Sequence, residues 1–349
     1  MKTILVTGGC GFIGSNFIHH VIKTSTYNII NLDKLTYAGN LMNLASVSKD
    51  RHLLVRGDIC DKDFLESLFN RYEFHSVVHF AAESHVDRSI DSPTDFIQTN
   101  IVGTLNLLET SKKYILKSKY KDFKFLHVST DEVYGSLGVN GKFFEDTAYD
   151  PSSPYSASKA GSDHLVRAWN RTYDLPTLIT NCSNNYGPYQ FPEKLIPLMI
   201  INAMNNKPLP VYGKGENVRD WLYVLDHCEA LLMVLESGAI GETYNIGGAN
   251  EIKNLNVVEI ICDVLDRCLP NRNKKSYKEL ITFVQDRPGH DFRYAIDATK
   301  INSKLGWSPK ESFESGLEKT ILWYINNVDW WKSILDNTYN QARLGISQS

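Results

Sequence analysis

The first half of the chain alternates short, mostly apolar runs with longer stretches in which apolar residues recur at helical spacing. The short runs end in polar residues and lie at 4–6, 29–32, 53–55, 77–80, 125–128 and 177–180. Between two of them, Phe64, Leu65, Leu68 and Phe69 keep helical spacing behind a candidate cap at Asp61. Apolar strands separated by helices are typical of a doubly wound parallel sheet with helices on both faces. We therefore expect an α/β fold with ligand-binding groups at the carboxyl ends of the strands.

The pattern changes after about residue 184. Prolines become frequent, and residues 243–246 form the clear strand pattern of this half, directly before Gly247 and Gly248. We expect residues 1–183 to form a nucleotide-binding domain. Residues 184–349 would form a smaller, mixed α/β substrate-binding part, and the strand near 243–247 is a candidate to rejoin the main sheet.

Composition narrows the classes of function. The chain has 349 residues, is 42% hydrophobic and carries a formal net charge of −3, so it can bury a full core but has no electrostatic footprint for nucleic acid or an anionic membrane. Its six cysteines are scattered without a zinc-binding spacing, so we expect no metal site and reduced thiols in the cytoplasm. No apolar run approaches transmembrane length, and the first residues show no signal-peptide cleavage pattern.

A glycine turn follows the first apolar run and opens a helical stretch. Gly8, Gly11 and Gly14 allow a tight turn and a close approach of backbone N–H groups to a diphosphate, as in a Rossmann-type fold. The alternative is a glycine-rich loop before an ordinary helix. Asp33 ends the second apolar run, roughly 20 residues after the last glycine, where a carboxylate accepts from a ribose hydroxyl. Because an acid repels a 2′-phosphate, we expect NAD rather than NADP.

Two further groups carry candidate chemistry. Tyr155 and Lys159 share a helix face, so the ammonium is expected to lower the pKa of the phenol from its usual value of about 10. Thr130, Asp131 and Glu132 follow a buried strand. The two acids either cap the next turn or divide into proton donor and proton acceptor, if their surroundings separate their pKa values.

These motifs identify a resemblance that covers nearly the whole chain. Together with the glycine turn, the matching segments are 32–39, 81–87, 129–135, 182–188, 192–197, 217–221 and 286–291. The chain resembles the nucleotide-sugar 4,6-dehydratases of the extended short-chain dehydrogenase/reductase family. The resemblance implies an NAD-dependent lyase that converts thymidine-diphosphate glucose to its 4-keto-6-deoxy form, for the synthesis of 6-deoxysugars such as rhamnose. It also implies a homodimer formed through the helices after Asp91 and Tyr155.

The resemblance also implies residue roles. Tyr155, held by Lys159, would take the proton of the 4-hydroxyl; Glu132 would take the C5 proton, Asp131 would protonate the leaving C6 hydroxyl, and Thr130 would contact the sugar. NAD would contact Gly8, Gly11, Phe12, Ile13, Gly14, Asp33, Lys34, Thr36, Asp58, Ile59, Ala81, Ala82, Ser84, Thr99, Tyr155, Lys159 and Asn185. The substrate would contact Ser84, Thr130, Asn184, Lys194, Leu195, Pro210, Tyr212, Arg219, Asn254, Arg287 and His290.

Arg219 and Arg287 also have an argument from charge alone. A nearly neutral protein that binds a diphosphate needs fixed cations, and the guanidinium group matches phosphate oxygens. The alternative for each arginine is a surface ion pair.

Three alternatives remain for the activity as a whole. A dehydratase acting on UDP-glucose and a nucleotide-sugar epimerase use related chemistry. A regulatory protein that only senses NAD belongs to a different class, and it would have no need of Tyr155, Lys159 and two carboxyl groups together.

Overall fold

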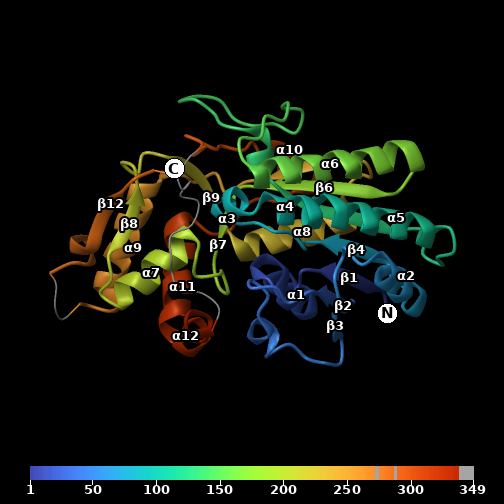
Figure 1. The fold of residues 1–349 in the computed structure, drawn as a ribbon, viewed down its shortest axis with the longest axis horizontal. Helices are drawn as coiled ribbons and strands as arrows, with labels where there is room; N and C mark the ends of the chain where they lie inside the picture. The colour runs from blue at the N-terminus through green and yellow to red at the C-terminus, as the bar shows by residue number, and fades with distance from the viewer. Residues whose placement is uncertain (272–274, 287–288, 338–349) are drawn as a thin grey trace.

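A seven-stranded parallel sheet forms the centre of the larger part of the molecule (Figure 1). The structure is a computed structural model and describes residues 1–271, 275–286 and 289–337. The strand order is β10-β6-β5-β4-β1-β2-β3. The strands span β1 (Thr3–Thr7), β2 (Asn28–Asp33), β3 (His52–Arg56), β4 (Ser76–His79), β5 (Lys124–Thr130), β6 (Thr177–Cys182) and β10 (Thr243–Ile246). The predicted doubly wound α/β fold is confirmed, and the order reverses between β1 and β4, where such sheets bind ligands.

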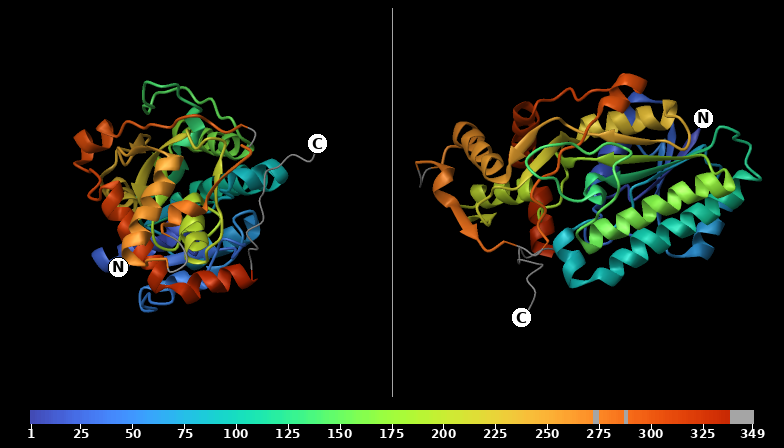
Figure 2. Two further views of the ribbon diagram at one scale, coloured as in Figure 1. Left: turned by 90° about the vertical axis from the view of Figure 1, so that its left-hand side faces the viewer. Right: turned by 90° about the horizontal axis from the view of Figure 1, so that it is seen from above.

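Helices cover both faces because neighbouring strand residues point to opposite sides. Ile4 and Val6 of β1 pack with helices α1 (Phe12–Thr24), α8 (Val224–Ser237) and α10 (Thr299–Leu305). Leu5, between them, packs in the core formed by α2 (Lys62–Arg71), α5 (Thr104–Ile115) and α6 (Pro154–Tyr173). In the view from above, α5 and α6 lie side by side along this second face (Figure 2).

Two of these helices begin at side-chain caps. The Asp61 carboxylate accepts from the backbone N–H of Phe64 at the start of α2. Ser153 and Ser156 form a reciprocal capping box at the start of α6, with Pro154 in the first turn, where its missing N–H costs nothing. The capping box fixes the position at which Tyr155 enters the helix.

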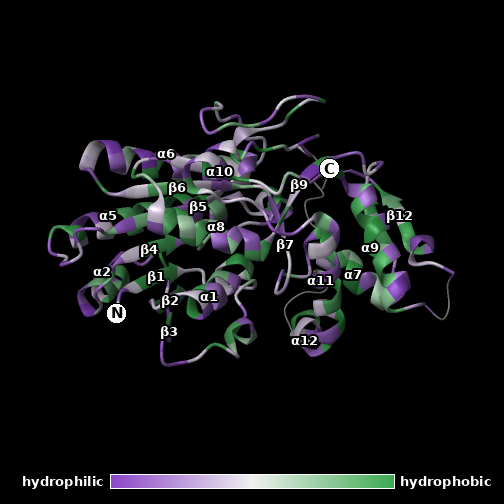
Figure 3. Ribbon diagram, turned by 180° about the vertical axis from the view of Figure 1, so that it is seen from behind, coloured by the Kyte–Doolittle hydropathy of each residue, from purple (hydrophilic) through white to green (hydrophobic). Residues whose placement is uncertain are grey.

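A smaller part with its own core lies beyond the carboxyl ends of the central strands, on the left of Figure 1. It contains one sheet of order β11-β9-β7 and a second of β12 and β8. The strands span β7 (Asn184–Tyr186), β8 (Leu209–Tyr212), β9 (Val218–Tyr223), β11 (Glu251–Lys253) and β12 (Ile281–Val284). Its helices are α7 (Leu195–Met204), α9 (Asn254–Cys268), α11 (Phe313–Asn326) and α12 (Val328–Asn337). The colouring by hydropathy shows apolar bands on α7 and α9 (Figure 3).

Short helical segments complete the chain. They span η1 (Leu41–Leu44), α3 (Val86–Asp91), α4 (Pro93–Phe96), η2 (Ile97–Gly103), η3 (Asp131–Tyr134) and η4 (Tyr277–Leu280). Segment η2 has π-helical geometry, and η3 carries the two acids singled out by the sequence.

The two parts of the fold interleave along the chain. Strand β10 pairs in parallel with β6, with Thr243 opposite Ile179, and helix α8 packs on α1. Both β10 and α8 come after residue 183 in the chain, yet they pack in the larger part. A division of the chain at residues 183 and 184 therefore stays a prediction. The smaller part in turn contacts the first half of the chain: the Trp330 indole N–H of α12 donates to the Asn43 side chain of η1, at 2.8 Å.

Candidate active site

A cavity of about 300 Å³ lies at the carboxyl ends of β1, β2, β4, β5 and β6. All of the residues predicted to contact the cofactor line this one cavity. Tyr155, Lys159, Thr130, Asp131 and Glu132, which were expected to carry the chemistry, line it as well. The sheet therefore brings together segments that are far apart in the sequence.

The glycine turn leaves room for a ligand by having no side chains. Gly8 has a φ of +71°, and a Cβ there would lie 2.7 Å from the backbone N of Ala81. A Cβ on Gly14 would lie 2.3 Å from the Gly8 carbonyl oxygen. Helix α1 then begins after Gly11 without a side-chain cap, so its first N–H groups are available to an anion. These features fit a dinucleotide diphosphate.

The predicted ribose acceptor is held rigidly. Asp33 accepts from the backbone N–H groups of Leu35, at 2.7 Å, and Cys10, at 2.8 Å. Burial raises its pKa, and these two hydrogen bonds oppose the rise. Nearby, Lys34 pairs with Asp58 at 2.7 Å, so its charge is already partnered. A fixed carboxyl group on the cavity wall fits a ribose diol and disfavours a 2′-phosphate.

The two acids occupy different environments. Asp131 is 1% exposed, and burial, followed by the charges of Glu132 and Asp220, raises its pKa well above the usual range. Glu132 is only half-buried. The turn is capped by Thr130, whose hydroxyl accepts from the Glu132 backbone N–H at 3.3 Å, so capping does not explain the acids. The raised pKa of Asp131 favours its protonated form, which a proton donor needs.

The pKa of Tyr155 shifts in the direction opposite to the one predicted from its spacing to Lys159. The Lys159 ammonium donates to the Val128 carbonyl oxygen at 2.9 Å. Burial, together with the charge of Glu132, raises the pKa of Tyr155 well above its usual value of about 10. Helical spacing puts the two residues on one face of α6, but removal of the phenol from water is the largest influence on its pKa.

The predicted substrate contacts are more dispersed. Ser84, Thr130, Asn184 and Lys194 line the cavity, and the Lys194 ammonium donates to the Ser84 carbonyl oxygen at 2.9 Å. Within the described part of the chain, the lining does not include Leu195, Pro210, Tyr212, Arg219, Asn254 or His290. Arg287 lies outside the described residues.

The dispersed residues still have defined surroundings in the smaller part. The Arg219 guanidinium donates to the carbonyl oxygens of Val218 and Asp291, and its charge opposes the raised pKa of Asp131. The Nδ1 of His290 lies 2.6 Å from an Asp286 carboxylate oxygen.

Sequence reasoning missed several residues of the cavity wall. They are Leu32, Ala38, Gly39, Gly57, Phe80, Glu83, Val128, Ser129, Cys182, Ser183, Gln190, Phe191 and Glu193. About half of them are apolar or small residues that lie at the end of a strand or directly after it. Such residues carry no chemical signal in the sequence. Glu193 lies within one of the motif segments. The Arg88 guanidinium donates to its carboxylate at 3.0 Å, and Arg88 is 105 residues earlier in the sequence, so the sequence alone does not pair them. A second missed feature is Asp163, one helical turn beyond Lys159, and this spacing was visible in the sequence.

Two searches of the described residues bear on other functions. They reveal no cluster of three or more potential metal ligands. Within the same residues, no helix is both long enough and apolar enough to span a membrane.

Comparison with known proteins gives consistent matches along the chain. The family model described as GDP-mannose 4,6 dehydratase matches residues 5–320. A dTDP-glucose 4,6-dehydratase of Neisseria meningitidis serogroup B is 57% identical over 355 residues, covering 100% of both chains. An Escherichia coli protein of the same name is 54% identical over 358 residues, covering 98% of this chain and 99% of that protein.

Solved structures agree with these relatives. The dTDP-glucose 4,6-dehydratase of Bacillus anthracis in complex with NAD has a TM-score of 0.86 and 48% identity, covering 96% of this chain and 100% of that one. A UDP-glucose 4-epimerase of Thermotoga maritima has a TM-score of 0.83 but 29% identity, covering 94% of this chain and 100% of that one. The fold is thus shared more widely than the details of the sequence.

Proposed function

The chain belongs to the dTDP-glucose 4,6-dehydratases, within the family described as GDP-mannose 4,6 dehydratase, and from this premise we propose how its residues remove water from the sugar. The enzyme is an NAD-dependent hydro-lyase that converts dTDP-glucose to dTDP-4-keto-6-deoxyglucose. The observation that carries the mechanism is the buried Asp131 beside the half-buried Glu132, on the wall of the cavity that holds Tyr155. An epimerase has no step that needs this pair of acids, and the epimerase relative is also far less similar in sequence.

The cofactor site is built by this chain's own residues. The turn at Gly8, Gly11 and Gly14 would hold the diphosphate, and Asp33 would accept from the ribose hydroxyls. The remaining wall, from Thr36 through Ala81 to Asn185, would enclose the two nucleoside ends. When bound, NAD would supply the hydride acceptor for C4, the hydride donor for C6 and, in its oxidised form, a positive charge within the site.

Tyr155 acts at the 4-hydroxyl, where its oxygen takes the proton as C4 becomes a ketone. Burial and the charge of Glu132 raise the pKa of this phenol, so positive charge in the filled site is needed for it to act as a base. Lys159 lies one turn away on α6 and supplies part of that charge. Thr130 offers its hydroxyl to the sugar.

Glu132 and Asp131 then complete the elimination. The new C4 ketone makes the C5 proton acidic, and Glu132 removes it. The C6–O bond breaks as Asp131 gives its proton to the hydroxyl, which leaves as water. After hydride reaches C6, Glu132 returns the proton to C5. Exchange with solvent then removes the proton that Tyr155 took from the 4-hydroxyl and restores the one that Asp131 gave up. The reaction is redox-neutral, and general acid–base groups typically contribute about 100-fold or more each.

The substrate extends from the cavity toward the smaller part. Ser84, Asn184 and Lys194 are proposed to contact it at the cavity wall. The cations Lys194, Arg219 and Arg287 are suited to the diphosphate. The remaining proposed contacts are Leu195, Pro210, Tyr212, Asn254 and His290.

Three wider properties are proposed with the activity. The product feeds the synthesis of 6-deoxysugars such as rhamnose. The six cysteines are unpaired, which supports a reducing, cytoplasmic location. The enzyme is a homodimer that uses α6 and the segments after Asp91, a proposal supported by Ile97, an apolar side chain that is 44% exposed in η2.

Mass spectrometry tests the activity. The protein is incubated with dTDP-glucose or with UDP-glucose and without added oxidant, and the nucleotide sugar is weighed. We expect loss of one water from dTDP-glucose in preference to UDP-glucose, without accumulation of NADH. A preference for the uridine nucleotide, or NADH formed in step with product, would contradict the proposal.

A further inference from the structure

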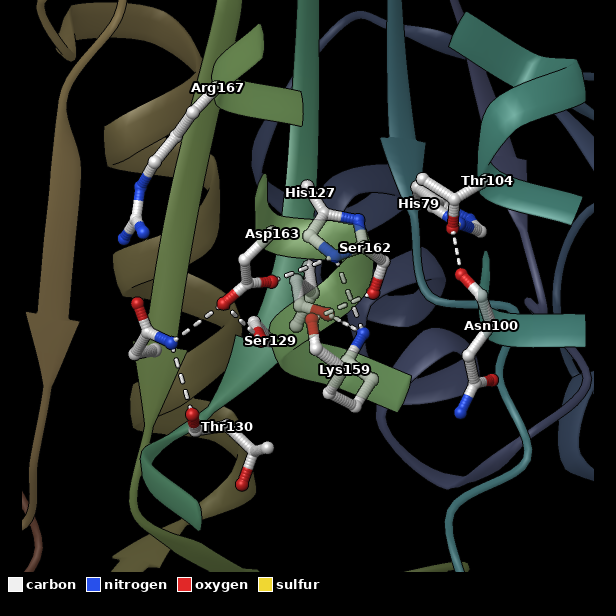
Figure 4. Close-up of polar contacts among 12 residues, drawn as sticks. His79, Asn100, Thr104, His127, Ser129, Thr130, Lys159, Ser162, Asp163 and Arg167 are labelled. Atoms are coloured by element: carbon white, nitrogen blue, oxygen red, sulfur yellow. Dashed lines mark hydrogen bonds and ion pairs between the residues drawn. The ribbon is translucent and has the colours of Figure 1, made fainter. Parts of the chain in front are cut away.

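A line of buried polar side chains runs from Lys159 past His127 to Asp163 (Figure 4). The Lys159 ammonium lies 3.5 Å from Nε2 of His127, and that nitrogen lies 3.2 Å from a carboxylate oxygen of Asp163. His127 and Asp163 are 0% exposed and do not line the cavity. They cannot touch substrate or cofactor, yet they form a continuous contact with Lys159.

Asp163 is held as a carboxylate. Its Oδ2 accepts from the hydroxyls of Ser129 and Tyr149, each at 2.9 Å, and from the Asn181 side-chain amide at 3.3 Å. Burial alone would raise its pKa, but the contact with His127, the charge of Lys159 and the Ser129 hydrogen bond together hold the pKa below the usual range. Three donors from β5, β6 and the loop before α6 therefore surround a buried negative charge.

Lys159 needs a partner because it is buried. It is 5% exposed, and burial lowers its pKa; Asp163 is the largest influence in the opposite direction. Burial, followed by the charge of Lys159, lowers the pKa of His127 to about 4, so the ring between the two is neutral near pH 7. An unpaired buried cation would be strongly disfavoured.

We propose that Asp163 is the counter-charge of Lys159: a positioning residue whose buried negative charge, on the far side of His127, keeps the lysine protonated. This inference rests on the role proposed for Lys159 in the reaction. It assigns a function to a residue that lies outside the cavity. The sequence pattern agrees, because Tyr155, Lys159 and Asp163 follow one another at four-residue spacing on α6.

The other titratable groups around Lys159 do not supply the negative charge. His79 of β4 has a pKa well below the usual range through burial, and burial raises the pKa of Cys182 of β6, so both are neutral near pH 7. The raised pKa values of Tyr155 and Asp131 likewise favour their neutral forms over negative charge. Glu132 lies on the cavity side. Arg167 adds a further cation, bound to the Tyr149 hydroxyl at 2.7 Å, which increases the need for Asp163.

The first test is the pH dependence of kcat/KM in Asp163→Asn with dTDP-glucose. The amide keeps the shape and an acceptor for Ser129 and Tyr149 but removes the charge. Lysine is charged below its pKa, so a lower pKa for Lys159 should move the alkaline limb to lower pH by about one to three units. A profile that is lower but parallel to that of the parent would overturn the proposal.

Tyr149→Phe is the matched control for this profile. It removes one hydrogen bond to Asp163 but keeps both charges, so its alkaline limb should stay within a few tenths of a unit of the parent's, whatever its stability. A limb that moves as far in Tyr149→Phe as in Asp163→Asn would assign the effect to packing and not to charge, and would overturn the proposal.

The second test does not depend on turnover, so it separates this inference from the proposed function. A double-mutant cycle combines Asp163→Asn with Lys159→Met and measures the melting temperature. When the lysine charge is absent, loss of the Asp163 carboxylate should lower the melting temperature by a smaller amount. The double variant should therefore have a higher melting temperature than Asp163→Asn. If Asp163→Asn fails to fold, the double variant should recover a folded protein. Additive losses, or no recovery, would show that Asp163 does not serve Lys159.

Discussion

At the scale of single residues, the roles of the neighbouring acids can be separated by experiment. The base at C5 is needed only after C4 has become a ketone, so Glu132→Gln should still reduce bound NAD when substrate is added but should stall before dehydration. We expect dehydration to fall by about 100-fold or more. Absorbance of the reduced cofactor and the mass of the nucleotide sugar measure the two steps.

Tyr155→Phe is the comparison for this variant. It lacks the group that acts on the 4-hydroxyl and should produce no reduced cofactor. The assignment of Glu132 fails if Glu132→Gln dehydrates at the parent rate, or if it loses reduction of NAD as completely as Tyr155→Phe.

The buried Asp131 carboxyl group, which is needed for catalysis, should lower the stability of the fold at neutral and alkaline pH. Its folded pKa is raised, so between its unfolded value near 3.8 and its folded value the native state binds more protons than the unfolded state. By linkage, its contribution to stability falls as the pH rises through this range. Asp131→Asn removes this penalty and should raise the melting temperature, more at pH 8 than at pH 5, while dehydration slows.

A pair of melting curves across pH checks this prediction. Asp146→Asn, at an exposed acid, is the control for the loss of one negative charge. An Asp131→Asn variant that is less stable than the parent at pH 8 would show that the carboxyl group is not held protonated in the fold.

Which residue-scale features the sequence could reveal depends on distance along the chain. Tyr155 and Lys159, and the triplet from Thr130 to Glu132, were visible because their partners are close in sequence. The environments were not visible. The pKa of Tyr155 is raised rather than lowered because burial depends on packing from many elements, and no local spacing reports it.

At the scale of elements, the turn after β1 tests the cofactor site. Gly8→Ala puts an alanine at a φ of +71°, in the left-handed region. Its Cβ would lie 2.7 Å from the backbone N of Ala81. We expect a loss of about 1–3 kcal/mol in stability and weaker binding of NAD. Calorimetric titration with NAD and thermal unfolding measure the two effects.

Gly138 provides the control for this substitution. A Cβ there would meet nothing within 4 Å, so Gly138→Ala should leave both NAD affinity and melting temperature near the parent values. Equal losses in the two alanine variants would contradict the close approach inferred at Gly8.

Most elements of the large sheet could be predicted because each buried parallel strand is a nearly continuous apolar run. The exceptions are informative. Strand β10 looked like a strand, but only its pairing with β6 places it in the large sheet. The smaller part was harder to predict because its strands are short, with β7 and β11 of three residues each, and prolines interrupt the pattern.

At the scale of the whole molecule, the two parts meet at an ion pair that the sequence could not reveal. Arg88 of α3 binds Glu193 at 3.0 Å, and its guanidinium lies 3.8 Å from the centre of the Tyr37 ring. Tyr37 also donates to Glu193 at 3.2 Å. The Glu193 side chain is 3% exposed and lines the cavity, directly before Lys194, so this contact links the joint between the parts to the site.

Removing the cation should therefore affect both stability and binding. Arg88→Met leaves the Glu193 carboxylate buried with Tyr37 but without its charged donor, and we expect a loss of about 1–3 kcal/mol. The wall that carries Lys194 should loosen, so KM for dTDP-glucose should rise more than kcat falls. Lys113→Met breaks an ion pair with Glu66 on the surface and should change neither quantity appreciably. If Arg88→Met lowered the melting temperature and left KM unchanged, the contact would serve only the fold, and the coupling between the joint and the cavity would be wrong.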